Sequence, residues 1–373
     1  MLSFWEQESL LHFDYAIIGS GIVGLSAAIS IKQANVKARV AVFEKGMLPT
    51  GASTKNAGFA CFGSVTEILD DLESMPESKV LELVEMRWKG LEILRTRLRK
   101  NKLDYHGYGG YELIGDNEIY AIDKIDYVNG LLQPIFKQSV FALADDKLAE
   151  FGFNKQKVKH LIYNPLEGQL QPGLMMRNLI ELANLLGVQI FTNSPIVSFN
   201  DSHSGVELLS EKGIVFKAQK LAICTNAFTQ QLIPEIGLKP GRGQVIVTKP
   251  IANLPFKGVF HFDAGYYYFR NYGDRIVFGG GRNLDFKGEA TTVFENTDLI
   301  IHELKKLLAE NILPNREFEV DYQWAGIMAF GENKYPICQK ISDNVVIGVR
   351  LGGMGVAIGS YLGKKIEEIL ASK

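Results

Sequence analysis

Apolar and polar positions divide the first 44 residues of the chain into three predicted elements. Residues 13–18 form an apolar run long enough for a buried strand, and residues 22–31 repeat apolar side chains at helical spacing. A second apolar run covers residues 38–43 and ends at Glu44. The pattern therefore predicts a strand, a helix and a second strand, with a glycine-rich turn between the first strand and the helix.

Similar patterns predict elements along the rest of the chain. Amphipathic spacing predicts a helix over residues 80–98, and residues 103–114 are expected to form two strands and a turn. A further helix is predicted over 174–186. The region 241–281 is rich in predicted strands separated by glycines, as in antiparallel hairpins. Residues 344–370 repeat the opening pattern of an apolar strand, a glycine turn and a helix.

The turn after the first strand contains the pattern G-x-G-x-x-G. Gly19 suits the tight turn, Gly21 lets the backbone approach a pyrophosphate, and Gly24 lets the helix pack against the strand. Free N–H groups at the helix N-terminus would bind the phosphates, and Glu44 would accept hydrogen bonds from ribose hydroxyl groups. The motif alone does not separate FAD from NAD. The expected contacts in this segment are Gly19, Gly21, Ile22, Val23, Gly24, Glu44 and Lys45.

Composition and charge limit the class of protein. The chain has 373 residues, which favours two domains, and its hydrophobic fraction of 46% and charged fraction of 22% are typical of globular proteins. A net charge of −2 disfavours a nucleic-acid partner. Widely spaced cysteines and scattered histidines indicate neither disulfides nor a metal site. No apolar stretch reaches the ~20 residues of a membrane helix, and no signal-peptide pattern is present, so a cytoplasmic protein is expected.

Further glycine-rich and small-residue motifs follow in a definite order. They are GSGIVG at 19–24 with Glu44, GASTKNAG at 51–58, ICTNA at 223–227, PGRGQ at 240–244, FGGGR at 278–282 and GGMG at 352–355. In this order the chain resembles the D-amino-acid oxidase family of FAD-dependent oxidoreductases, which includes glycine oxidase, sarcosine oxidase and γ-glutamylputrescine oxidoreductase.

The resemblance implies an α/β fold with two interleaved domains. A Rossmann-like FAD-binding domain would be assembled from residues 1–72, 158–232 and 320–373. An α+β substrate domain, built on a large antiparallel sheet, would comprise residues 73–157 and 233–319. The strand, turn and helix unit at each end of the chain is consistent with this division, because both units would direct a helix N-terminus at one cofactor.

The resemblance also implies where FAD lies. It places the loop of residues 53–59 along the pyrophosphate and the isoalloxazine ring, the backbone of Val197 at the adenine, and the turn of residues 352–356 near the flavin pyrimidine. The FAD is expected to be non-covalent, because Cys338 lies too close to the last glycine turn to match the cysteine that holds the flavin in sarcosine oxidases. The remaining implied contacts are Ser53, Thr54, Asn56, Ala57, Gly58, Phe59, Val197, Thr225, Asn226, Ala227, Gly352, Gly353, Met354, Gly355 and Val356.

The implied reaction is hydride transfer to flavin N5 from a C–H bond next to an amine nitrogen. The partner would be a small-molecule amine, and the electron acceptor is left open as oxygen, a quinone or another protein. The cofactor supplies the chemistry, and the protein supplies orientation and electrostatics. No general base is required when the amine arrives neutral, which agrees with the lack of a recognisable catalytic triad in the sequence.

The candidate substrate residues depart from the family pattern in one respect. Alternation places Tyr266, Tyr268 and Arg270 on one face of a strand, either as substrate contacts or as aromatic packing. Amino-acid oxidases of the family carry an arginine for the substrate carboxylate where this chain has Met328, near Trp324. A simple α-amino acid is therefore a less favoured substrate, and an amine far from its carboxylate, as in γ-glutamylputrescine, fits better. Arg270, Arg282 and Arg350 remain as possible partners of an acid, or as structural residues.

Three other functions compete with amine oxidation. A flavin enzyme that acts on a modified uridine in tRNA is disfavoured by the net charge of −2. A flavin-binding protein without turnover is compatible with the intact cofactor motifs. An NAD-dependent dehydrogenase is disfavoured by the C-terminal glycine turn. Reduction of the flavin by amines without oxygen would separate an amine oxidoreductase from a flavin-binding protein without turnover, and electrophoretic retention of tRNA would support the tRNA-modifying enzyme.

Overall fold

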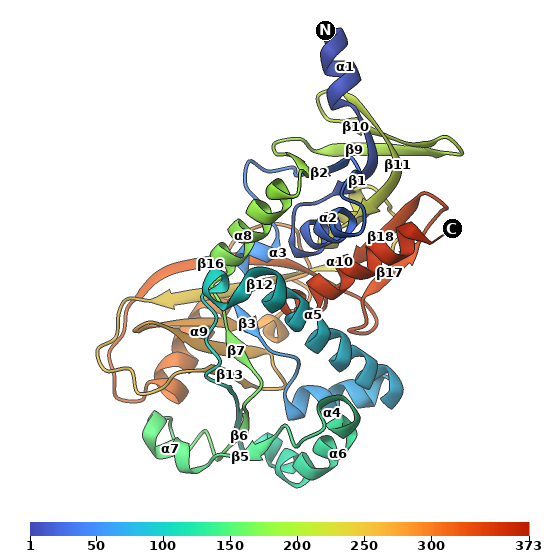
Figure 1. Ribbon diagram of the computed structural model, residues 1–373. Helices are drawn as coiled ribbons and strands as arrows, with labels where there is room; N and C mark the ends of the chain where they lie inside the picture. Colours follow the sequence, from blue (N-terminus) through green and yellow to red (C-terminus); the bar gives the residue numbers. More distant parts are fainter. Residues whose placement is uncertain (373) are drawn as a thin grey trace.

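The computed structural model describes residues 1–372, apart from the side chain of Lys100. Two large sheets dominate it, and helices pack against each (Figure 1). The chain crosses between the two sheets several times, because strands of the second sheet lie between strands of the first along the sequence. The two domains are thus interleaved, and both ends of the chain lie in the layer that contains the first sheet.

The first sheet is mainly parallel and has the strand order β17-β18-β11-β1-β2-β8, with β10 paired to β11 and β9 paired to β10. β1 runs parallel to both β2 and β11, so the carboxyl ends of these strands meet at one edge. That edge is where open α/β sheets bind ligands. The strands are β1 (His12–Ile18), β2 (Val40–Phe43), β8 (Gln189–Phe191), β9 (Ile196–Ser202), β10 (Gly205–Ser210), β11 (Val215–Ile223), β17 (Ile337–Lys340) and β18 (Val345–Val349).

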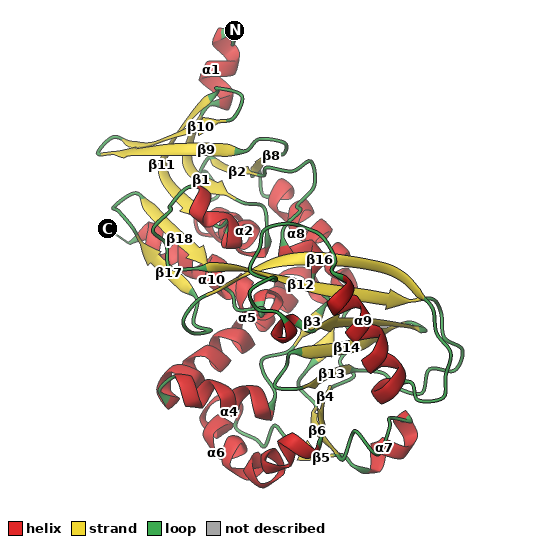
Figure 2. Ribbon diagram, turned by 180° about the vertical axis from the view of Figure 1, so that it is seen from behind, coloured by secondary structure: helices red, strands yellow, loops and turns green. Residues whose placement is uncertain are grey.

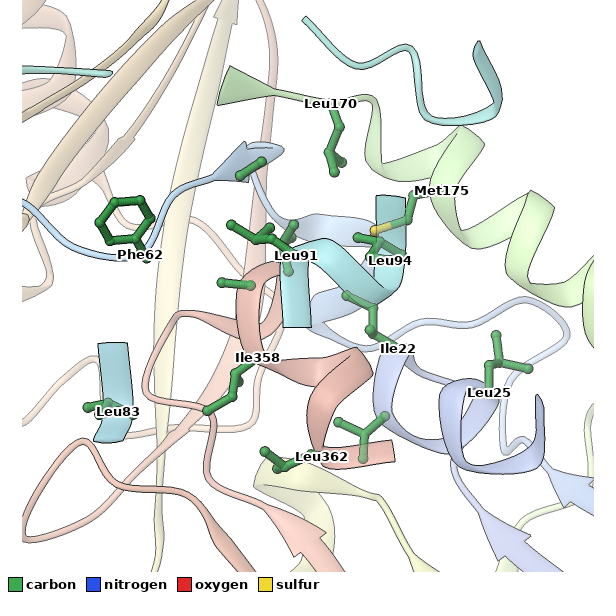
Figure 3. Close-up of a cluster of buried hydrophobic side chains, with 14 of the residues drawn as sticks. Ile22, Leu25, Phe62, Leu83, Leu91, Leu94, Leu170, Met175, Ile358 and Leu362 are labelled. Atoms are coloured by element: carbon green, nitrogen blue, oxygen red, sulfur yellow. The ribbon is translucent and has the colours of Figure 1, made fainter. Parts of the chain in front are cut away.

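Four helices form the core beside the first sheet: α2 (Ile22–Ala34), α5 (Glu77–Leu103), α8 (Pro172–Leu185) and α10 (Gly355–Ala371). Figure 3 shows Ile22 and Leu25 of α2, Leu91 and Leu94 of α5, and Ile358 and Leu362 of α10 converging in one cluster. Glycine allows the close approach of α10 to α2, because a Cβ added at Gly363 would overlap with Ser26. The helices α2 and α10 thereby bring segments near the two ends of the sequence together.

The second sheet is mainly antiparallel and has the strand order β16-β12-β15-β14-β13-β4-β6-β5. One face is covered by α9 (Asp298–Leu307) and by phenylalanine side chains that include Phe260, Phe269 and Phe278. The other face is turned toward the first domain. The strands are β4 (Gly110–Ile114), β5 (Ala142–Leu143), β6 (His160–Asn164), β12 (Lys239–Thr248), β13 (Val259–Phe262), β14 (Tyr267–Tyr272), β15 (Arg275–Gly280) and β16 (Val320–Phe330).

Shorter elements connect these layers. Strands β3 (Phe59–Ala60) and β7 (Gly168–Gln169) form a separate two-stranded sheet, and each lies in a segment where the chain passes from one large sheet to the other. The N-terminal helix α1 projects away from the rest of the chain (Figure 2). The remaining helices are α1 (Phe4–Leu10), α3 (Ala52–Lys55), α4 (Val65–Ser74), α6 (Ile125–Phe136) and α7 (Asp146–Phe151), with short 3-10 or π turns at 116–124, 226–231, 282–284 and 308–312.

The secondary structure and the strand pairing differ from the expectation at three places. β6 and β16 pair within the second sheet, although both were expected in the FAD-binding domain. Residues 103–114 contain only β4, since α5 continues to Leu103. Residues 53–59 were expected to form a loop, and the short helix α3 (Ala52–Lys55) covers the start of that segment. Strand pairing depends on partners distant in sequence, which a local pattern does not reveal.

Candidate active site

A cavity of about 930 Å³ lies at the carboxyl ends of β1, β2 and β11. Three glycine-rich segments line it, which are the turn after β1, the loop around α3, and the turn after β18. Residues of β12, β14 and β16 of the second sheet line it as well. The cavity is therefore bounded by both sheets, and it joins the expected cofactor site to the expected substrate site.

The first glycine turn has the geometry that its sequence predicts. Gly19 has a φ of 105°, a conformation that L side chains rarely adopt, and its N–H donates to the carbonyl of Phe43 at 2.8 Å. A Cβ added at Gly24 would overlap with the carbonyl oxygen of Gly19. Gly24 thus lies behind the turn and permits helix packing, whereas Gly19 and Gly21 line the cavity.

The N-terminus of α2 and the α3 loop converge on one point. The N–H group of Ile22 donates to Oγ of Ser53 at 3.0 Å, and a Cβ added at Gly21 would lie 3.0 Å from the same oxygen. Backbone N–H groups, the positive end of the helix dipole and a hydroxyl group are therefore together at this point. Such a set of donors suits phosphate oxygens.

Glu44 is buried beside the same turn, at the end of β2. Its Oε2 atom accepts hydrogen bonds from the N–H (3.2 Å) and the hydroxyl group (2.7 Å) of Ser20, and its Oε1 atom accepts one from the N–H of Gly46 (3.0 Å). The carboxylate is thus held in one orientation at the cavity wall. The ammonium of Lys45 lies 3.5 Å from the ring centroid of Phe228, and burial lowers the pKa of this lysine.

The α3 loop is shaped by Asn56. Its Nδ2 atom donates to the carbonyl of Ser53 at 2.8 Å, and its Oδ1 atom accepts from the N–H of Gly58 at 2.9 Å. Gly58 has a φ of 81°, and a Cβ there would overlap with the carbonyl of Leu170. The Asn56 hydrogen bonds hold the backbone of this segment in its shape, and the small residue at position 58 lets that backbone pass close to Leu170 beside the cavity.

The C-terminal glycine turn completes the wall. Gly352 and Gly353 have φ values of 55° and 84°, and both line the cavity at the N-terminus of α10. The N–H group of Arg350 donates to Oδ1 of Asn226 at 3.1 Å, which links this turn to the segment after β11. Two helix N-termini, those of α2 and α10, therefore open onto one cavity, as a bound FAD would require.

Most of the cofactor contacts implied by the sequence line the cavity. Thr54 does not, because its hydroxyl group donates to the carbonyl of Pro49 at 2.8 Å within the loop. Val197 does not either, and Ser194, Pro195 and Ile196 line that end instead. Ala227 is buried in a small core next to the cavity. The implied contacts that line it are Gly19, Gly21, Ile22, Val23, Glu44, Lys45, Ser53, Asn56, Ala57, Gly58, Phe59, Thr225, Asn226, Gly352, Gly353, Met354, Gly355 and Val356.

The wall opposite the cofactor segments comes from the second sheet. Tyr266, Tyr268 and Met328 line the cavity, and the ring of Phe59 lies 5.4 Å from that of Tyr268. A Cβ at Gly243 would lie 2.7 Å from Cε of Met328, so the glycine leaves room for the thioether. This wall is mainly aromatic and apolar.

Two of the expected substrate residues have other roles in the structure. Trp324 does not line the cavity, because its Nε1 atom donates to the carbonyl of Lys55 at 2.9 Å. Arg270 lies on the expected face of β14, but its guanidinium is buried and donates to the carbonyls of Ala57 and Leu170. The α3 loop therefore lies between Arg270 and the cavity, and Arg270 does not line the cavity.

The structure adds charged residues that the sequence patterns did not indicate. They line the cavity on the side of α4, α5 and β13, and they are Glu67, Arg87, His261 and Lys334. His261 lies directly opposite Tyr268 in the antiparallel pair of β13 and β14. The sequence indicates a hairpin here, but it does not give the register that places His261 beside Tyr268. Lys334 pairs with Asp71 at 2.7 Å, which neutralises both charges.

His261 and Glu167 form a neutral pair behind this wall. Nε2 of His261 lies 3.9 Å from Oε2 of Glu167, and both side chains are buried. Burial raises the pKa of Glu167 to about 8 and lowers the pKa of His261. At neutral pH the carboxyl group therefore keeps its proton, and the imidazole stays uncharged.

Neither a metal site nor a membrane span is present in the part of the chain that the structure describes. No three His, Cys, Asp or Glu side chains converge as metal ligands within residues 1–372. In the same range, no helix combines the length and the apolar character needed to cross a membrane. Cys338 does not line the cavity but packs at the edge of the main core.

Comparisons with known proteins agree with this geometry. The chain is 25% identical over 374 residues to the probable oxidoreductase OrdL of Haemophilus influenzae, which covers 96% of this chain and 83% of that protein. The structure of glycine oxidase from Geobacillus kaustophilus superposes with a TM-score of 0.80 at 16% identity, over 96% of this chain and 95% of that one. L-proline dehydrogenase from P. horikoshii gives a TM-score of 0.79 at 16% identity, over 97% and 94%.

The family assignment rests on the sequence match rather than on the shared fold. A family model described as FAD dependent oxidoreductase matches residues 14–369, which is nearly the whole chain. The match spans the turn after β1, the α3 loop and the turn after β18, which all line the cavity. The protein is therefore a member of the FAD dependent oxidoreductase family, the DAO family.

Proposed function

We propose that the protein oxidises the C–H bond next to the nitrogen of an amine or of an N-substituted amino acid. The observation that carries the proposal is the continuity of the cavity, in which the wall of Tyr268 and Met328 faces the segments expected to bind the nucleotide. The names of the two structural neighbours support this class, since one is a glycine oxidase and the other an L-proline dehydrogenase.

FAD, when bound, supplies the hydride acceptor at its N5 atom. The residues of this chain would hold it through Glu44 at the ribose, the N-terminus of α2 and Ser53 at the phosphates, and the turn of residues 352–356 at the flavin. The positive end of the α10 dipole would favour negative charge on the reduced ring. These assignments rest on the cavity lining and on the hydrogen bonds of Ser53 and Glu44.

The apolar wall would bind the reacting part of the substrate and exclude water from it. Phe59, Tyr268 and Met328 surround this region with aromatic and thioether groups. Removing an ammonium group from water lowers its pKa, so this wall favours the neutral amine. The neutral amine has the lone pair that assists departure of the hydride, and no side chain needs to act as a strong base.

The substrate is expected to be larger than the simplest amino acids. Met328 stands where related amino-acid oxidases carry a carboxylate-binding arginine, and a thioether does not pair with a carboxylate. Glycine and D-alanine are therefore expected to reduce the flavin slowly, whereas longer amines and N-substituted amino acids are expected to reduce it faster.

The test is an anaerobic screen of the purified holoenzyme. The visible absorbance of the oxidised flavin is followed after addition of polyamines, N-methyl amino acids, D-amino acids and hydroxy acids. Bleaching by amines but not by hydroxy acids supports the proposal. Bleaching by hydroxy acids alone, or rapid bleaching by glycine and D-alanine, contradicts it.

A further inference from the structure

The arginines near the cavity differ in whether their charge is already compensated. Arg242 forms a two-point ion pair with Glu289, with distances of 2.8 and 2.7 Å. Arg270 donates to backbone carbonyls, and Nε of Arg350 donates to the carbonyl of Tyr335 at 2.8 Å. Each of these guanidinium groups therefore has partners within the protein.

Arg282 is different, because its guanidinium forms neither an ion pair nor a hydrogen bond with any residue in the range 1–372. It lies half-buried in the cavity wall between two aromatic rings. Its Cζ atom is 3.9 Å from the ring centroid of Phe330 and 4.7 Å from that of Phe286. The rings hold the planar group in place by cation–π contacts but leave its N–H groups free.

Arg282 also lies next to the position at which related oxidases carry their arginine. The Cδ atom of Arg282 lies 3.6 Å from the point where a Cβ of Gly241 would stand. Gly241 is the direct Cα partner of Met328 between β12 and β16. The side chain of Arg282, just beyond the end of β15, thus reaches the strand pair that carries Met328, and glycine at 241 makes room for the ring of Phe330 on which the guanidinium packs.

Within residues 1–372, no carboxylate forms an ion pair with Arg282. Glu289, whose charge raises the pKa of Arg282, is already paired with Arg242 and also accepts hydrogen bonds from Gln244 at 3.0 Å. Partial desolvation of a cation without a counter-ion costs free energy, and binding of an anion offsets this cost. A carboxylate suits a guanidinium, because two parallel N–H···O bonds can form.

We propose that Arg282 binds the carboxylate of the substrate, so that the substrate is an amine that also carries a carboxylate. This proposal rests on the proposed function and narrows its substrate class. Arg282 would act as a specificity-determining residue. From its position just after β15, it would bind the carboxylate in place of the arginine that related oxidases carry on the strand corresponding to β16, where this chain has Met328.

A second charge suggests how such a substrate would be oriented. Glu67 lines the cavity on the other side of the Gly265–Tyr266 turn. It accepts a hydrogen bond from the N–H of Ser64 at 3.0 Å, and the charges of Lys334 and Arg87 help to lower its pKa, so it stays a carboxylate. Its carboxylate would repel a substrate anion and attract an ammonium. The carboxylate of the substrate is therefore expected toward Arg282, with the cationic or amine end toward α4.

Butyrate and butyramide provide a test that does not require turnover. They have similar shapes, but only butyrate has a negative charge at neutral pH. Both are titrated into the purified yellow holoenzyme, and binding is followed as a change in flavin absorbance. The wild type is expected to bind butyrate at least tenfold more tightly than butyramide. Equal affinity for the two compounds, or no binding of butyrate, would overturn the proposal even if amines reduce the flavin.

Variants then identify the residue. Arg282→Met is expected to weaken butyrate binding at least tenfold and to leave butyramide binding within twofold, whereas Arg282→Lys should keep part of the preference. Lys287→Met is the matched control, because this exposed lysine also lines the cavity and its loss removes the same charge. Loss of the preference in Lys287→Met with its retention in Arg282→Met would overturn the proposal. Failure of every amine to reduce the flavin would instead contradict the proposed function.

Discussion

The hydroxyl group of Ser20 donates a hydrogen bond of 2.7 Å to Oε2 of Glu44. This bond joins the glycine turn after β1 to the end of β2, and it holds the carboxylate at the wall of the cavity. The residue expected to bind the ribose is therefore oriented before the cofactor arrives, which reduces the entropic cost of binding.

Replacing Glu44 with alanine is expected to weaken FAD binding by about 1–3 kcal/mol, because charge-assisted hydrogen bonds to the ribose are lost. Ser20→Ala keeps the carboxylate but removes its orienting hydrogen bond, so a smaller loss is expected. Titration of the apoprotein with FAD, followed by flavin fluorescence, measures both effects. Unchanged affinity in Glu44→Ala would show that the adenosine lies elsewhere.

Gly24→Ala is expected to destabilise the protein by about 1–3 kcal/mol or more, because the added methyl group overlaps with the carbonyl oxygen of Gly19. Gly130→Ala is the control, since this glycine lies within α6 and an added Cβ meets no atom within 4 Å. Helix propensity predicts that the control is stabilised by up to about 1 kcal/mol. Thermal unfolding of both variants measures the difference, and equal melting temperatures would contradict the close packing of α2 on the turn.

Arg270→Met is expected to lower the melting temperature and the FAD content, because the carbonyls of Ala57 and Leu170 lose a buried donor. Each unsatisfied carbonyl costs about 1–3 kcal/mol. KM values for amines with and without a carboxylate are expected to change to the same extent. Arg275→Met serves as the control, because this arginine is only half-buried in its pair with Asp321. A selective rise in KM for carboxylate-bearing amines in Arg270→Met would restore this arginine as a substrate contact.

Glu167→Gln is expected to change how stability depends on pH. Burial raises the pKa of Glu167 from 4.5 to about 8, so the folded state binds this proton more tightly than the unfolded state. The stabilisation by this group is full below pH 4.5 and is lost as the pH rises through about 8. Glutamine keeps the acceptor for the N–H of Phe62 but does not ionise.

Urea unfolding between pH 4 and pH 9 (roughly the range over which the carboxyl group titrates) measures this effect. The variant should gain stability relative to the wild type as the pH rises, by the order of a few kcal/mol. The variant His106→Gln is a suitable reference, since this histidine is a half-buried member of a pair with Asp104, whereas the carboxyl group of Glu167 accepts from the N–H of Phe62. Parallel stability curves for Glu167→Gln and the wild type would show that the carboxyl group ionises freely in the folded state.

The local part of the cofactor site was predictable from the sequence. The turn of residues 19–24 and Glu44 belong to one strand, helix and strand unit, so their relation depends on short-range geometry that glycine and the apolar pattern specify. The family match confirms FAD as the cofactor of this family. The α3 loop and the C-terminal turn were also identified, because each has its own concentration of small residues.

Only the tertiary structure decided which charged side chains reach the substrate part of the cavity. Alternation correctly placed Tyr268 and Arg270 on one face of β14, whereas Tyr266 lies in the turn before that strand. The α3 loop, more than 200 positions away along the chain, covers Arg270. Arg282 lines the cavity in contact with Phe330 of β16, and that ring has space because residue 241 in the neighbouring β12 is glycine. A sequence pattern determines the face on which a side chain lies, whereas packing between distant segments determines whether that face is covered or open.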